Sequence, residues 1–148
     1  MTPFMKAVSV AMLAGLMPLA ACSGPSGPPS EASKPVEASR VAAVRVHADW
    51  CPNCRALDPK VEEVSASDSW DGVTFVRIDY TSRDKYVVFS EAEALGLRPA
   101  IEGYFADGIK TGMLLLIDIE TQTVVDVMTH KESAGDIAER LRDAQASS

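Results

Sequence analysis

Apolar positions along residues 40–146 recur with the spacings that distinguish strands from helices. Four short apolar runs are typical of strands, at residues 40–47, 73–79, 113–119 and 124–129. Three longer stretches place apolar residues three or four positions apart and predict amphipathic helices, at residues 51–66, 83–95 and from about 133 onward. Gly96 is expected to end the second helix, and Ser133 to cap the third.

The predicted elements follow the order strand, helix, strand, helix, strand, strand, helix. Two strand-to-helix crossovers, then an antiparallel hairpin and a closing helix, predict an α/β fold with a four-stranded mixed sheet and helices on both faces. Residues 100–110 fit a short helical insertion better than a strand. One folded domain over residues 41–148 is therefore predicted.

The N-terminal part of the chain has a different pattern. Residues 1–21 contain one basic residue, Lys6, and then an apolar run of about 15 residues, fewer than the roughly 20 that span a bilayer. This arrangement predicts a signal peptide. Residues 22–40 are rich in Ser, Gly, Pro, Ala and Glu and have no apolar face, so they predict a flexible tether.

The net charge of the chain limits the classes of molecule that it is expected to bind. The chain has 14 basic and 21 acidic residues, for a net charge of −7, and loss of Lys6 with the signal peptide makes the mature charge −8. This excess of acidic residues argues against the binding of nucleic acid or of anionic lipid head groups.

Cys51 and Cys54 form a Cys-x-x-Cys pair that follows the first predicted strand and opens the first predicted helix. Only a thiolate attacks a disulfide, and a free cysteine near pKa 8.5 is mostly protonated at neutral pH. Because the N-terminus of a helix favours the anion, Cys51 is the expected nucleophile. Pro52 suits the first helical turn, and Cys54 is expected to lie deeper and to resolve a mixed disulfide.

The segment Ala48-Asp49-Trp50-Cys51-Pro52-Asn53-Cys54, with Pro59 five residues further on, resembles the active-site motif of the thioredoxin superfamily. The first four residues of this segment, Ala48-Asp49-Trp50-Cys51, are similar to those of bacterial cell-envelope members that exchange electrons with disulfides. The resemblance covers residues 41–146 and implies a minimal thioredoxin-like fold in the order βαβαββα, with the tether in place of the usual extra N-terminal strand and helix. It also implies that Trp50 flanks the sulfurs and that the Pro52-Asn53 dipeptide influences the reduction potential.

Arg45 departs from the family pattern. Thioredoxins carry a buried aspartate six residues before the first cysteine, where it accepts the proton of the second thiol, and this chain has Arg45 there. An arginine cannot act as that base. Two alternatives are open: Arg45 reaches the sulfurs and stabilises a thiolate, or it extends to the sheet edge and contacts nothing. Proton transfer from Cys54 would then use water or a carboxylate such as Asp49.

The cis-proline that faces the cysteine pair in this family has two candidate positions. Thr111-Gly112 directly precedes the strand at residues 113–119, so Gly112 is the expected residue. Pro99 is the alternative, because the segment 95–99 resembles the family's approach to its cis-proline. A glycine there is expected to leave more room beside Cys51.

The segment Leu19-Ala20-Ala21-Cys22 resembles the lipobox of bacterial lipoproteins, in which the cysteine is lipidated and becomes the first mature residue. The resemblance implies a lipid anchor on the periplasmic side of a membrane. Ser23 at the next position favours the outer membrane. Simple secretion with a free Cys22 is the alternative.

These features predict a lipid-anchored periplasmic thiol-disulfide oxidoreductase that uses no cofactor. Its expected partners are envelope proteins with disulfides or dithiols, and a redox partner that recharges the pair. A metal site is not expected, because zinc takes about four ligands and the chain adds only His47 and His130 to the cysteines. Two alternatives are open: a copper or zinc chaperone that uses Cys51, Cys54 and His47, and a redox-inactive thioredoxin-like binding module.

Overall fold

The computed structural model describes residues 39–147, so the predicted signal peptide at residues 1–21, Cys22 and most of the predicted tether lie outside the described residues. The elements in chain order are β1 (Val41–His47), α1 (Pro52–Ser67), β2 (Val73–Asp79), α2 (Lys85–Ala94), α3 (Arg98–Tyr104), β3 (Met113–Asp118), β4 (Thr123–Thr129) and α4 (Ala134–Ser147). Within residues 39–147, no helix combines the length and the hydrophobicity of a membrane span.

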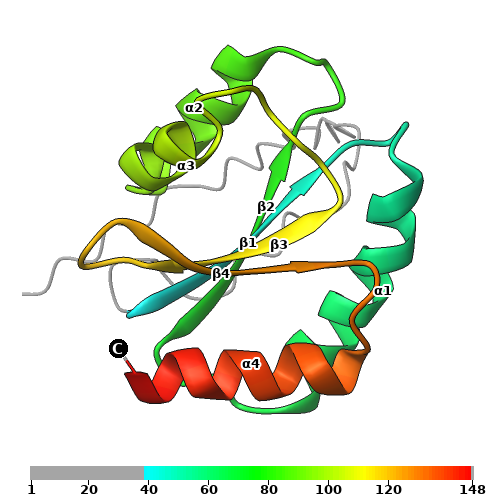
Figure 1. The fold of residues 1–148 in the computed structure, drawn as a ribbon, viewed down its shortest axis with the longest axis vertical. Coiled ribbons are helices and arrows are strands. Elements are labelled where there is room, and N and C mark those ends of the chain that lie inside the picture. The colour runs from blue at the N-terminus through cyan, green and yellow to red at the C-terminus, as the bar shows by residue number, and fades with distance from the viewer. Residues whose placement is uncertain (1–38, 148) are drawn as a thin grey trace, which may run out of the picture.

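The strands form one mixed sheet in the order β2-β1-β3-β4 (Figure 1). β1 pairs with β2 in parallel and with β3 in antiparallel orientation, and β3 and β4 form an antiparallel hairpin. The predicted four-stranded mixed sheet and the order βαβαββα are confirmed, with α3 as the helical insertion. The insertion begins before residue 100, because Pro99 fits the first turn of α3.

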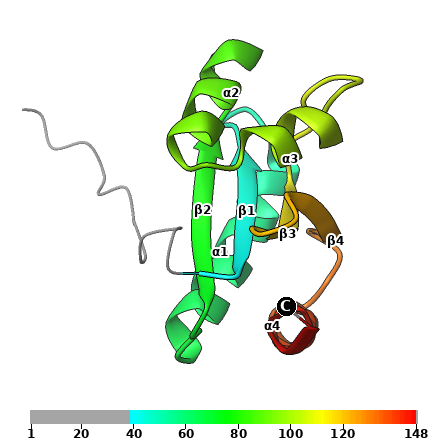
Figure 2. The same ribbon diagram turned by 90° about the vertical axis from the view of Figure 1, so that its left-hand side faces the viewer.

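Helices cover both faces of the sheet, with α1 and α4 on one face and α2 and α3 on the other (Figures 1 and 2). In β1, Val41 and Ala43 belong to the core shared with α1 and α4. The alternate residues Ala42, Val44 and Val46 belong to the core shared with α2 and α3. Because both faces of β1 are buried, its sequence is continuously apolar until Arg45 rather than alternating.

The carboxyl end of β1 presents polar side chains to α1. Arg45 and His47 continue the row that begins with Val41 and Ala43, since alternate residues of a strand share a face. Both side chains contact Asp58 of α1. The change from apolar to polar within this row places charged groups beside the start of α1.

Two predicted helix ends are confirmed and one is shifted. Gly96 follows α2 with a φ of +70°, and Ser133 Oγ accepts the Asp136 N–H at 3.2 Å at the start of α4. The sequence predicts α2 from residue 83, but the helix begins at Lys85. The reason is that the side chain of Asp84 accepts a backbone N–H of the first turn and so caps the helix there.

Candidate active site

Cys51 is the N-cap residue of α1, at the end of the loop that leaves β1. Its backbone N–H donates to the Ala48 carbonyl at 2.9 Å, which turns the chain toward the helix. Its Sγ accepts the backbone N–H of Cys54 at 3.1 Å, as a capping side chain does. The sulfur therefore lies at the positive end of the helix dipole.

The two thiols are unpaired and differ in depth. Cys54 is 1% exposed, and its Sγ donates to the Val46 carbonyl at 3.8 Å. Cys51 is 4% exposed. Cys54 is therefore the deeper thiol, although Cys51 is itself largely covered.

The environments of the two sulfurs favour opposite protonation states. Burial raises the pKa of the Cys51 thiol, but hydrogen bonds to its sulfur outweigh this effect and leave the pKa below its usual value. These bonds come from the side chains of Cys54 and Thr111 and from the backbone N–H groups of Cys54 and Asn53. Burial and the hydrogen bond with Cys51 raise the pKa of Cys54 to about 11.

Gly112 is the residue that lies against Cys51 at the start of β3. A Cβ at this position would be 3.3 Å from Cys51 Sγ and 2.6 Å from Asn53 Cβ. Its φ of +78° also favours glycine. Gly112 thus occupies the place for which it is expected, whereas Pro99 lies in the first turn of α3. The extra room predicted beside Cys51 is absent, because the first turn of α1 approaches the glycine closely.

Trp50 lies on the rim of the site, 42% exposed. Its indole N–H donates to the Thr81 carbonyl at 3.1 Å, and the guanidinium of Arg83 lies 4.4 Å from its ring centroid. Tyr80 meets the indole edge-on with ring centroids 6.3 Å apart. The loop after β2 therefore completes the rim. The sequence alone does not reveal this contribution, because no local pattern links residues 80–83 to the cysteines.

Three other predicted site residues surround the cysteines as exposed positions. Pro52 and Asn53 form the first turn of α1, and Asp49 precedes Trp50 in the loop. The Asp49 N–H donates to Thr81 Oγ1 at 3.1 Å, which joins the loop before α1 to the loop after β2.

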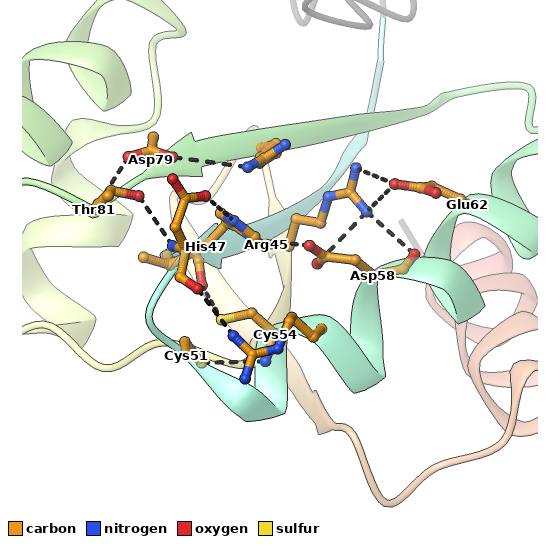
Figure 3. Close-up of polar contacts among 12 residues, drawn as sticks. Arg45, His47, Cys51, Cys54, Asp58, Glu62, Asp79 and Thr81 are labelled. Atoms are coloured by element: carbon orange, nitrogen blue, oxygen red, sulfur yellow. Dashed lines mark hydrogen bonds and ion pairs between the residues drawn. The ribbon is translucent and has the colours of Figure 1, made fainter. Parts of the chain in front are cut away.

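Arg45 is directed toward α1, where its guanidinium lies between two carboxylates (Figure 3). Nη1 is 3.3 Å from the Asp58 carbonyl and 3.7 Å from Asp58 Oδ1, and Nη2 is 3.4 Å from Glu62 Oε1. The alternative in which Arg45 contacts nothing is wrong. The guanidinium pairs with these carboxylates rather than with a thiolate.

His47 lies between two carboxylates (Figure 3). Its Nε2 is 3.2 Å from Asp49 Oδ1, and its Nδ1 is 2.7 Å from Asp58 Oδ2. Sequence analysis did not identify Asp58 as part of the site. The available signal was its spacing of four residues from Cys54, which places both side chains on one face of α1.

Within residues 39–147, one cluster of metal-ligand groups is found, and it combines His47, Asp49 and Asp79 with ligand atoms within 4.8 Å of one another. Asp79 already accepts a backbone N–H at 2.8 Å. The cluster includes neither Cys51 nor Cys54, and both ring nitrogens of His47 face carboxylates. This arrangement does not favour a soft-metal site built from the two cysteines and His47.

The chain is similar to several known proteins. Residues 31–95 match the family model of thioredoxin. A thiol:disulfide interchange protein of the thioredoxin family from Chlorobium tepidum TLS is 24% identical with a TM-score of 0.52, over 74% of this chain and 82% of that chain. Trxlp from Edwardsiella tarda EIB202 is 18% identical with a TM-score of 0.46, over 72% of this chain and 86% of that chain.

A disulphide isomerase from Xylella fastidiosa Temecula1 is 18% identical with a TM-score of 0.42, over 73% of this chain and 80% of that chain. No curated protein gives a significant match. The match to the thioredoxin family model over residues 31–95 and the β2-β1-β3-β4 sheet show that this chain has a thioredoxin-like fold, with a Cys-x-x-Cys pair at the start of α1.

Proposed function

We propose that this protein is a thiol-disulfide oxidoreductase in which Cys51 is the nucleophile and Cys54 is the resolving thiol. The observation that carries the proposal is the unequal environment of the two sulfurs. Hydrogen bonds at the N-terminus of α1 lower the pKa of Cys51, whereas burial raises the pKa of Cys54 to about 11. A nucleophilic thiol has to be ionised at the working pH, and its partner has to stay protonated until the second step.

In the reductive direction, the Cys51 thiolate attacks one sulfur of a substrate disulfide. A Cys51–substrate disulfide forms, and the other substrate sulfur leaves as a thiolate and takes up a proton. Cys54 then loses its proton and attacks the Cys51 sulfur, so that the Cys51–Cys54 disulfide forms and the second substrate thiolate leaves. The substrate disulfide gains two electrons from the pair, one proton that Cys54 releases and one proton from the solvent, which took up the proton of Cys51 when that thiol ionised. The oxidative direction is the reverse.

The surface that a substrate meets is built from the residues around Cys51. Trp50, Pro52 and Asn53 are exposed there, Thr111 is partly exposed, and Gly112 lies against Cys51 and Asn53. Partner proteins in this proposal carry a disulfide or a dithiol. A second redox protein is required to recharge the pair after each turnover, and no cofactor is involved.

Reduction of insulin disulfides tests the assignment. Cys51→Ser removes the attacking sulfur and is expected to abolish the activity. Cys22→Ser is the matched control, because it makes the same substitution outside the pair, and it should leave the rate unchanged. Undiminished activity of Cys51→Ser would defeat the assignment. A wild-type chain that neither reduces disulfides nor oxidises dithiols would favour a redox-inactive binding module.

We also propose that the protein works in the bacterial envelope. The support comes from residues 1–40, which combine a signal-like apolar run, a lipobox-like segment ending at Cys22 and a Pro/Ser/Gly-rich stretch. In this proposal a lipid on Cys22 anchors the protein on the periplasmic side, with Ser23 favouring the outer membrane. The tether then lets the redox domain reach partners near the membrane surface.

A further inference from the structure

The resolving step requires a group that removes the proton of Cys54. The Cys54 S–H donates to the Val46 carbonyl, and a backbone carbonyl is not a base that can take this proton. Arg45 carries no acceptor atom and stays protonated. The acceptor has to be another titratable group near the carboxyl end of β1 or on the inner face of α1.

Two such groups contact each other between β1 and α1, the two elements next to Cys54. His47 directly follows Val46 in β1, and Asp58 lies one turn after Cys54 on the same face of α1. Both side chains are mostly buried, with 8% of the imidazole and 17% of the carboxylate side chain exposed. Strand β1 and helix α1 thus bring two titratable groups together, one helical turn from Cys54.

The contact between these two groups is unusual. His47 Nδ1 lies 2.7 Å from Asp58 Oδ2, yet this buried nitrogen has no aligned hydrogen bond. A ring nitrogen and a carboxylate oxygen at this distance repel each other unless a proton lies on one of them. The pair offers two adjacent atoms that can hold a proton, and a buried nitrogen without an aligned partner calls for a functional explanation.

Other charged groups face His47 from each neighbouring element. Asp49 lies 3.2 Å from Nε2 in the loop after β1, and Asp79 lies opposite His47 on β2. Arg45 shares the strand face with His47 and binds Asp58. Three carboxylates therefore surround the imidazole.

We propose that the His47–Asp58 pair accepts the proton of Cys54 during resolution of the mixed disulfide. This inference rests on the proposed function. The proton moves from Cys54 to the pair, directly or through one water molecule, and the Cys54 thiolate attacks the Cys51 sulfur. The Cys51–Cys54 bond forms, the Cys51–substrate bond breaks, and the departing substrate thiolate takes a proton from the solvent or from the pair.

The test separates the two chemical steps in one experiment. The full chain carries Cys22→Ser, so Cys51 and Cys54 are its remaining thiols, and it is mixed with an equimolar amount of the aromatic disulfide DTNB. Attack by Cys51 releases the first thionitrobenzoate, and attack by Cys54 on the resulting mixed disulfide releases the second. The first phase reports on the proposed function, and the second reports on the proton acceptor.

His47→Gln and Asp58→Asn are expected to leave the first phase near its wild-type rate. They should slow the second phase on the order of 100-fold at neutral pH, the usual contribution of a positioned base. The difference in second-phase rate between these variants and the wild type should decrease as the pH rises, because hydroxide then removes the proton of Cys54. Asp58→Glu, which restores a carboxylate, should recover much of the rate.

Glu62→Gln is the matched control, because it removes the other carboxylate that Arg45 binds but not a partner of His47. It should leave the second phase unchanged. An unchanged second phase in both His47→Gln and Asp58→Asn would overturn the inference. The inference would also be overturned if the two variants slowed the second phase by the same factor at every pH, or if Glu62→Gln slowed it as much as they do. Either result would mark a purely structural effect. Absence of the first phase in the starting protein would instead overturn the proposed function.

Discussion

Cys51 and Cys54 lie one helical turn apart, but the Cys51 sulfur accepts a backbone hydrogen bond whereas the Cys54 thiol donates one. Cys51 Sγ receives the Cys54 N–H at the start of α1, so its negative charge is stabilised. The Cys54 S–H donates a hydrogen bond to the Val46 carbonyl in a nearly closed environment, so its neutral form is stabilised. In the proposed reaction, this difference, rather than the presence of two thiols, sets the order of the chemical steps.

The pH dependence of alkylation should reveal this difference. Because the pKa of Cys51 is lowered, its reaction with iodoacetamide should persist below the pH at which an ordinary cysteine, near 8.5, loses its thiolate. Cys54 should react only as the pH approaches about 11. Mass spectrometry of digested samples of the reduced chain assigns each modification. Modification of Cys54 before Cys51 would contradict the prediction.

The placement of Cys51 at the start of α1, with Cys54 one turn further and deeper, could be predicted from their spacing and from the helix that follows them. The contacts of Arg45 and His47 could not, because they depend on how closely β1 and α1 approach. That approach is set by apolar packing of residues such as Leu57 against the sheet. A strand pattern shows that Arg45 and His47 share a face, but only the packed structure shows that Asp58 faces them.

The start of α1 and the loop before β3 depend on each other. Gly112 leaves no space for a side chain, since a Cβ there would lie 2.6 Å from Asn53 Cβ and 3.3 Å from the Cys51 sulfur. The loop supplies the Thr111 side chain that helps to lower the pKa of Cys51. Any change that separates the two segments should therefore affect both stability and reactivity.

Gly112→Ala tests this dependence. The new methyl group and the φ of +78° should lower the free energy of unfolding by more than about 1 kcal/mol. The alkylation profile of Cys51 should move to higher pH as the loop withdraws. Gly103→Ala is the control, because Gly103 lies in α3 with nothing within 4 Å of an added Cβ. The prediction would be contradicted if urea unfolding showed the same decrease in the free energy of unfolding for both variants.

Strands could be placed from the sequence almost to the residue, because each is a short apolar run between polar turns. Helix α2 could not, because its start depends on Asp84 acting as a cap rather than on apolar spacing. Likewise, the close fit at Gly112 is a property of two segments about 60 residues apart in the chain. Such contacts carry no local signature.

The whole molecule combines a folded redox domain with an N-terminal part whose role is proposed from sequence. If Cys22 carries the lipid, Cys22→Ser should move the protein from the membrane fraction to the soluble periplasmic fraction. The loss of acyl chains removes the apolar surface that holds the protein at the bilayer. Fractionation of cells followed by immunodetection measures the change. Equal membrane association of both proteins would contradict a lipid anchor at Cys22.

Trapping of the mixed disulfide tests the order of attack most directly. The full chain with Cys22→Ser carries in addition Cys54→Ser, or separately Cys51→Ser, and is incubated with a model peptide disulfide and analysed by mass spectrometry without reductant. Cys54→Ser should accumulate a covalent adduct on Cys51, because the first attack proceeds and the second cannot. Cys51→Ser should form none at neutral pH. An adduct on Cys54 in Cys51→Ser, with none on Cys51 in Cys54→Ser, would contradict the assignment of Cys51 as the nucleophile.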